Sequence, residues 1–217
     1  MQTLQQRTQR MVIDRLSATR TGKNITLAGL GGAGLSRGVV RAQDATPESP
    51  FDAPVDVVNY ALTLEHLEAT FYRLGLEEFD EAAFTDLGYQ ADVRERIVAI
   101  GDHETEHVDA LIAVVDQLGG EPVEEAEYDF GYTTLEEFLA TAAVLEGVGV
   151  AAYGGAAQFL IEEDELLTAA LTIHGVEARH ASYLNLMTGS ASPFPAAFEA
   201  PLTPDEVLEL ATPFIVS

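Results

Sequence analysis

From residue 52 onward, apolar side chains recur every three or four residues, the period of an α-helix, rather than alternating as in a strand. Helix boundary signals divide this pattern. Pro54 suits a first helical position, Gly119 and Gly120 suit a helix end, and Thr134 with Glu137 forms a capping box. The pattern predicts four long helices, over residues 54–76, 90–118, 134–160 and from the acidic turn at 162–165 to 187.

Two shorter elements are also predicted. The segment LEEFDEAAF at 76–84 suits a short helix directly after the first long one. A second capping box at 203–206, with Pro204 in the first helical position, opens a short C-terminal helix. Strand signals are thin, and YDFGY at 128–132 is the one candidate. The expected fold class is therefore all-α.

The connections predict how these helices are arranged. Short connections join the first helix to the second and the third to the fourth, so each pair forms an antiparallel hairpin. About 15 residues lie between the second and third helices; extended, they span about 50 Å, more than the roughly 38 Å of a helix of about 25 residues. We therefore expect a four-helix bundle of two hairpins joined by one long crossover.

The segment IGDHETEHVDAL at 100–111 places a carboxylate on a face that should be buried. At about 100° per residue, Glu104 lies at the centre of an arc that also holds Ile100, Val108 and Leu111, with His107 about 60° away. A buried carboxylate without a partner costs several kcal/mol or takes up a proton. The segment is therefore either not a helix or part of a site.

An internal repeat favours the site. IHGVEARHASYL at 173–184 aligns with the first segment, and Glu177 is likewise centred on an apolar face, three residues before His180. The first and third helices match as well, because LEHLEATFY and LEGVGVAAY each place a tyrosine two helical turns after a glutamate. The chain therefore contains two copies of one hairpin, Glu-x6-Tyr followed by Glu-x-x-His.

Two such hairpins around a pseudo-twofold axis direct four carboxylates and two imidazoles to one place. This combination of oxygen and nitrogen ligands suits a pair of iron or manganese ions in a four-helix bundle. The chain has no cysteine, which argues against a structural zinc site. The alternative is a plain bundle in which the glutamates are protonated or partly exposed. The predicted ligands of the two ions are Glu65, Glu104, His107, Glu146, Glu177 and His180.

The same stretches resemble the ferritin-like superfamily. ALTLEHLEATFY, LEGVGVAAYGGAA and PLTPDEVLELATPFI are similar to its branch that includes the desiccation-related proteins, here of a haloarchaeal type. The resemblance implies a ferritin-like domain over residues 52–217, the six metal ligands named above, and hydrogen bonds from Tyr72 and Tyr153 to the carboxylates. Ferritins, rubrerythrins and manganese catalases share this site but differ in reaction, so the resemblance does not fix the chemistry. We expect reaction of the metal pair with O2 or peroxide, of a ferroxidase, peroxidase or catalase type, in a role in oxidative stress. The non-enzymatic alternative is a stress- or desiccation-related bundle that sequesters metal or serves a structural purpose.

Several side chains near these motifs have two interpretations. Glu68 lies inside the apolar arc of the first helix, about 60° from Glu65. It is either an extra bridging ligand or a glutamate at the edge of the surface. His174 falls on the face of the fourth helix that carries Glu177, one turn before it. It is either a neighbour of the site or a core histidine. Three further residues are expected to face the flanks or solvent: His66, His103 and Glu106.

The third helix is apolar and rich in glycine. Residues 142–161 reach the length of a membrane span, but Glu146 at their middle disfavours one. Glycines at 147, 149, 154 and 155 each weaken a helix by about 1 kcal/mol. In exchange, they permit close approach of a neighbouring helix or of a second subunit, which leaves a homo-oligomer open.

Charge separates the first 43 residues from the rest. The chain carries 36 acidic and 11 basic residues, yet seven basic residues and only one acidic residue, Asp14, precede residue 42. From residue 42 onward, 35 acidic residues face 4 basic ones and lysine is absent. In molar salt, the repulsion between these carboxylates is screened within a distance of about 3 Å. The composition therefore indicates a halophilic source; an acidic mesophilic protein is the alternative. The shortage of basic residues disfavours nucleic acids and anionic membranes as partners.

The first 43 residues predict a targeting segment. A basic start precedes the apolar, glycine-rich run at 25–40, and small residues at Val40 and Ala42 suit cleavage after Ala42. The segment resembles a twin-arginine signal, although Arg20 is followed by Thr21 where a second arginine is expected. We therefore expect an exported protein with a linker at 44–51; a cytoplasmic protein with a disordered basic tail is the alternative.

Overall fold

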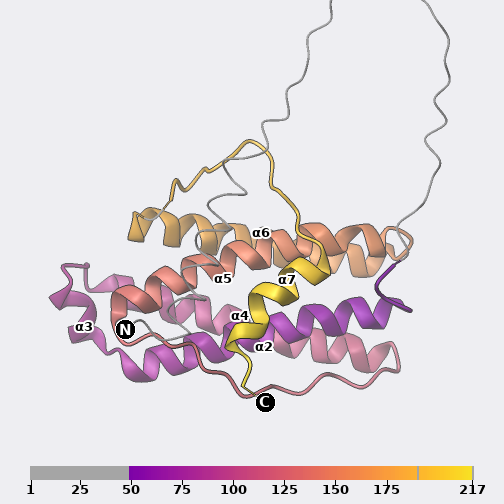
Figure 1. Ribbon diagram of the computed structural model, residues 1–217, viewed down its shortest axis with the longest axis horizontal. Coiled ribbons are helices and arrows are strands. Elements are labelled where there is room, and N and C mark those ends of the chain that lie inside the picture. Colours follow the sequence, from indigo (N-terminus) through magenta and orange to yellow (C-terminus); the bar gives the residue numbers. More distant parts are fainter. Residues whose placement is uncertain (1–48, 190, 217) are drawn as a thin grey trace, which may run out of the picture.

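The computed structural model describes residues 49–189 and 191–216, and this part of the chain forms an all-α four-helix bundle (Figure 1). The predicted fold class is confirmed, and each long helix begins within about two residues of its predicted start. A 3-10 helix at 157–160 continues the third long helix to its predicted end. The four long helices are α2 (Pro54–Glu78), α4 (Asp92–Gln117), α5 (Leu135–Ala156) and α6 (Asp164–Thr188).

The helices are connected as two hairpins. Helices α2 and α4 pack along each other and so do α5 and α6, and a short helix, α3 (Glu81–Asp86), lies in the first connection. The segment 118–134 runs along the bundle from one end to the other (Figure 1). Because it returns the chain to the end where α4 began, α5 points in the same direction as α4. The two Glu-x-x-His helices are thereby brought into one bundle interior.

Local signals set the helix ends. The Thr134 side chain accepts a hydrogen bond from the backbone N–H of Glu137, whose carboxylate in turn accepts the backbone N–H of Thr133 at 2.8 Å. At the C-terminal end of α6, Gly189 adopts a left-handed φ of 64°, which side chains other than glycine rarely take. These caps satisfy backbone groups that a helix end would otherwise leave without partners.

Two local predictions need correction. The sequence LEE at 76–78 completes α2 instead of starting the short helix, which begins only at Glu81 behind the N-cap Asp80. The one strand candidate, 128–132, forms no strand: in the described part of the chain, Tyr128 forms only an isolated antiparallel bridge with Ile215. Alternating aromatic residues there resemble a strand because this crossover segment packs its rings onto the bundle.

The C-terminal segment ties the two hairpins to the crossover. Helix α7 (Pro204–Ala211) lies across α2 and α5 (Figure 1), and the residues behind it pair with the crossover through hydrogen bonds of 2.8 Å from Asp129 N to Phe214 O and from Val216 N to Glu127 O. Before α7, the chain crosses α5 so closely that a Cβ on Gly155 would lie 1.8 Å from the Leu202 carbonyl oxygen.

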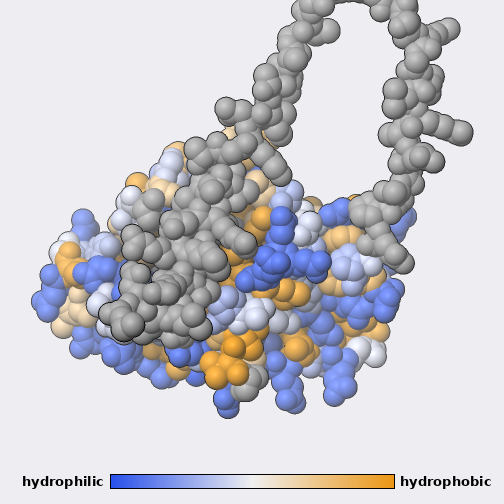
Figure 2. Space-filling model, viewed as in Figure 1, coloured by the Kyte–Doolittle hydropathy of each residue, from blue (hydrophilic) through white to orange (hydrophobic). Residues whose placement is uncertain are grey.

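The bundle interior contains two apolar clusters. The larger includes Phe71 stacked on Phe138 at a centroid distance of 4.7 Å, together with Tyr72. The smaller includes Leu62, Val108 and Tyr153. Each cluster therefore holds the ring of one of the two repeat tyrosines. Figure 2 shows hydrophilic side chains in blue spread over the visible described surface, with smaller orange apolar areas between them.

One helix in the described part of the chain, Leu135–Leu160, is long and apolar enough to cross a membrane. In its most apolar stretch, 78% of the residues are buried inside the bundle, so its composition reflects a core position and is no sign of a membrane span. The predicted signal-like segment 1–43, its cleavage after Ala42 and most of the linker lie outside the described residues.

Candidate metal centre

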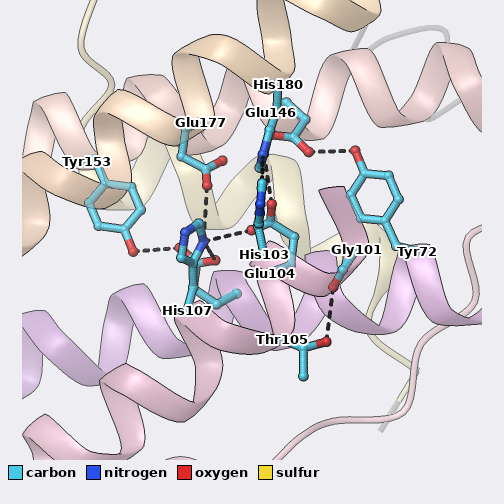
Figure 3. A network of polar contacts seen from close by, with 11 residues as sticks. Tyr72, Gly101, His103, Glu104, Thr105, His107, Glu146, Tyr153, Glu177 and His180 are labelled. Atoms are coloured by element: carbon cyan, nitrogen blue, oxygen red, sulfur yellow. Dashed lines mark hydrogen bonds and ion pairs between the residues drawn. The ribbon is translucent and has the colours of Figure 1, made fainter. Parts of the chain in front are cut away.

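Side chains from four helices meet inside the bundle (Figure 3). The glutamate of each Glu-x6-Tyr motif comes from α2 or α5, and the Glu-x-x-His pairs come from α4 and α6. All four glutamates are fully buried, and the two histidine side chains are 11% and 7% exposed. Partly exposed glutamates are thereby excluded. The structure brings together all six residues that the repeat predicts, namely Glu65, Glu104, His107, Glu146, Glu177 and His180.

These residues form two overlapping groups, in each of which the candidate ligand atoms lie within 4.8 Å of one another. Glu65 and His107 belong only to the first group, and Glu146 and His180 only to the second. Glu104 and Glu177 belong to both. The cluster therefore offers two adjacent positions for a cation with two carboxylates between them.

Both histidines direct Nδ1 into the cluster. The Nδ1 atom of His107 lies 3.0 Å from Glu104 Oε2 and 3.2 Å from Glu65 Oε2. The Nδ1 atom of His180 lies 2.9 Å from Glu104 Oε1 and 3.1 Å from Glu146 Oε2. Glu104 thus has one histidine beside each of its two oxygens.

Each repeat tyrosine donates a hydrogen bond to the glutamate of the other hairpin. Tyr72 on α2 donates to Glu146 Oε1 on α5, and Tyr153 on α5 donates to Glu65 Oε1 on α2, each at 2.5 Å. Figure 3 shows the two tyrosines reaching the cluster from opposite sides. The sequence places each tyrosine on the same helix face as the glutamate of its own hairpin. Each tyrosine contacts the glutamate of the other hairpin because α2 and α5 pack antiparallel.

Burial controls protonation in the cluster. Desolvation raises the pKa of Glu65 to about 7 and, with neighbouring carboxylates adding to it, raises the pKa of Glu177 well above its usual range. For Glu104, burial is outweighed by hydrogen bonds with the two histidines, which lower its pKa to about 2. Burial alone would lower the pKa of His107, but hydrogen bonds with Glu104 and Glu65 raise it to about 10. Without metal the cluster therefore holds protons that a cation would displace.

The residues present fit a metal pair. Within the described part of the chain, neither buried carboxylate oxygen of Glu177 has a hydrogen bond, and its charged neighbour is His107, whose Nδ1 lies 3.4 Å from Oε1. Such atoms are costly in a protein interior unless a cation or a proton compensates them. Oxygen and nitrogen donors converge here without any thiolate, which is the donor set that iron and manganese prefer.

The residues with two interpretations are now placed. Glu68 is buried beside the cluster on α2, with an exposed fraction of 3%, and belongs to neither ligand group. His174 is half-buried on α6 and joins neither ligand group. Glu106 is exposed on α4, as predicted.

The predictions for two histidines were incomplete. His66 is buried rather than solvated, and its Nε2 lies 3.1 Å from the carbonyl oxygen of Val123 in the crossover. His103 is exposed, but its Nδ1 lies 3.0 Å from Nε2 of His180, the ring atom that faces away from the cluster. The two rings stack with an angle of 10° between their planes. Sequence periodicity could not reveal either contact, because both partners lie on other elements.

The chain matches the family model described as a ferritin-like domain over residues 53–190, more than half of its length. It is also 27% identical over 183 residues to Protein rds1 of Schizosaccharomyces pombe, and the aligned region covers 82% of this chain and 44% of that protein. The chain thus spans less than half the length of this relative. All six converging side chains lie within the matched region. The bundle, the buried carboxylate and histidine cluster and the family match agree, and the chain belongs to the ferritin-like domain family.

Proposed function

We propose that the protein binds a dinuclear iron or manganese centre and uses it to react with O2 or peroxide. The observation that carries the proposal is that two adjacent ligand groups share Glu104 and Glu177. Shared carboxylates allow two cations to lie side by side, and two divalent ions balance the charge of four carboxylates. Membership of the ferritin-like family supports the same metal chemistry.

Each residue has a defined task in this proposal. Glu65 with His107 would hold one ion and Glu146 with His180 the other, while Glu104 and Glu177, which belong to both groups, would be available to either ion. When bound, a pair of iron or manganese ions supplies one-electron oxidation and reduction steps, which reaction with O2 or peroxide requires. The fully buried glutamates keep bulk water from the ions, so a small molecule is the substrate that fits.

The tyrosines fix the outer carboxylates. Tyr153 occupies Oε1 of Glu65 and Tyr72 occupies Oε1 of Glu146, while Oε2 of each glutamate lies beside its histidine. One oxygen of each outer carboxylate is thereby held in place and the other is left for an ion. Such outer hydrogen bonds typically contribute about 10- to 100-fold to metal affinity or activity.

Metal analysis and two activity assays test the proposal. Protein reconstituted with Fe(II) or Mn(II) in concentrated KCl should retain close to two ions per chain after removal of excess metal. It should then oxidise Fe(II) in the presence of O2 or accelerate the decay of peroxide. Two bound ions without either reaction would assign the chain to metal sequestration. Absence of bound transition metal after reconstitution would contradict the proposal.

The stress-related role, the location and the salt requirement remain part of the same proposal. A segment of 43 residues with a signal-like pattern supports export, and 35 acidic residues from position 42 onward support a high-salt environment. Thermal melting over a KCl series tests the second point, because screening of repulsion between carboxylates should raise the melting temperature steadily toward molar salt.

A further inference from the structure

Glu68 is a fifth buried carboxylate beside the cluster. It lies three residues after Glu65 on α2 and is 3% exposed. Its Oε2 atom has no hydrogen-bond partner in the described part of the chain. Its carboxyl group interacts electrostatically with Glu146, Glu65 and Glu104, three of the six predicted ligands. A carboxylate in such a position needs a proton or a cation.

A missing side chain on α5 makes room for it. Residue 149 is the repeat counterpart of Glu68 and is a glycine. A Cβ at this position would lie 2.7 Å from Glu177 Oε2 and 3.3 Å from Glu68 Oε1. The space beside Gly149 is therefore filled by two carboxylate oxygens from two different helices. One of them belongs to a glutamate that both ligand groups share.

A cavity beside Glu68 offers no compensation for the charge of this carboxylate. The cavity has a volume of about 20 Å³ and is lined otherwise by apolar residues and glycine, among them Leu67, Val148 and Phe214. A cavity of this size holds about one water, which needs two to four polar partners to be well bound. The polar surroundings of Glu68 thus lie on the side of the metal cluster.

We propose that Glu68 is a fifth carboxylate ligand of the dinuclear centre and binds the ion held by Glu146 and His180. It is placed on that side because Glu146 is the ligand that interacts with it most strongly, and because it lies one helical turn before Tyr72, whose hydroxyl group contacts Glu146. The inference rests on the proposed function and makes the centre asymmetric. With Glu68 added to the four residues of that group, one ion would have five protein side chains around it and the other four, because the position equivalent to Glu68 is Gly149.

Metal affinity tests this directly. Chelator competition with Mn(II) measures both binding steps in the wild-type chain and in the variants Glu68→Gln and Glu68→Leu. Glu106→Gln on the exposed face of α4 is the matched control. We expect both Glu68 variants to bind one ion as the wild type does and the other at least about tenfold more weakly, since even outer-shell losses cost 10- to 100-fold. The control should bind both ions with wild-type affinity.

A spectroscopic readout separates ligation from structure. With Co(II) at two equivalents, the visible absorption bands of both Glu68 variants should differ from those of the wild type, while the control spectrum stays unchanged. If Glu68→Leu does not fold, the isosteric Glu68→Gln variant decides alone. If Glu68→Gln binds both Mn(II) ions with wild-type affinity and has an unchanged Co(II) spectrum, Glu68 is a protonated structural group. A wild-type chain that binds no metal overturns the proposed function itself.

Discussion

Tyr72 of the first hairpin donates its hydroxyl hydrogen to Glu146 of the second across 2.5 Å, and the repeat supplies the same bond in the other direction, from Tyr153 to Glu65. The two hairpins therefore hold each other's outer carboxylates. Neither half of the chain can orient its own glutamate fully, so the site exists only when the hairpins are docked.

Removing one of these hydroxyl groups should weaken both the bundle and the metal site. Tyr72→Phe leaves Glu146 Oε1 without its buried donor, which we expect to cost about 1–3 kcal/mol of unfolding free energy. It should also lower metal affinity by about 10- to 100-fold. Denaturant unfolding and chelator competition measure the two effects. Tyr60→Phe is the control, because within the described residues the buried Tyr60 hydroxyl has no hydrogen-bond partner; its loss should leave stability equal or higher.

The two bridging glutamates should respond differently to the loss of their charge. Glu177 has a raised pKa, no hydrogen bond to either oxygen in the described chain and one longer contact, 3.4 Å from Oε1 to His107 Nδ1, so Glu177→Leu should leave the metal-free protein as stable or more stable. Glu104 pairs with both histidines, so Glu104→Leu should destabilise the metal-free protein. Both variants should lose two-ion binding. Equal melting temperatures for the two metal-free variants would contradict this distinction.

Metal-free protein should lose stability as pH rises. The folded protein keeps the Glu65 proton up to about pH 7, whereas the usual carboxyl pKa is 4.5, so stability falls across that interval. His107 has a folded pKa of about 10 against 6.5, so its contribution is complete below pH 6.5 and is lost as pH rises through 10. Bound metal replaces these protons, so metal affinity should rise over the same range. Melting curves between about pH 6 and pH 9, with and without Mn(II), measure both trends; parallel curves would contradict the prediction.

Two glycines of α5 provide a matched pair of substitutions. Gly149→Ala places a Cβ 2.7 Å from Glu177 Oε2, so the metal affinity should fall even though alanine favours a helix. Gly147→Ala meets no atom within 4 Å in the described chain and should stabilise the bundle by up to about 1 kcal/mol. Metal titration and thermal melting of both variants compare the effects. Wild-type metal binding by Gly149→Ala would show that the gap is not needed.

The predicted signal implies a defined mature N-terminus. If cleavage follows Ala42, the native protein begins at Gln43 and loses seven of its 11 basic residues. Mass spectrometry of the intact protein from its source organism measures this. Peptides from residues 1–40 in the mature protein would favour the cytoplasmic alternative.

The fold and the six converging residues could be predicted because both depend on periodicity. A glutamate centred on an apolar helix face is a local signal, and its repetition in Glu104 and Glu177 showed that it was not accidental. Which glutamate each tyrosine hydroxyl contacts could not be predicted from the sequence, since it depends on how α2 and α5 pack. The contact of His103 with His180 was missed for the same reason, because an exposed position on α4 gives no indication of what α6 presents. The role of Gly149 had a signal in the repeat alignment, but only the packed structure shows which oxygen atoms occupy its space.

The closing of the bundle by its last residues bears on how the protein matures. Leu210, Ala211 and Phe214 line the cavity beside Glu68, and the segment that contains them is anchored to the crossover by backbone hydrogen bonds. A ribosome delivers these residues after both hairpins have been synthesised. A growing chain can therefore assemble its four-helix core while the side next to Glu68 is still uncovered. Translation order thus leaves the side next to Glu68 open until the segment that contains Leu210 and Phe214 docks.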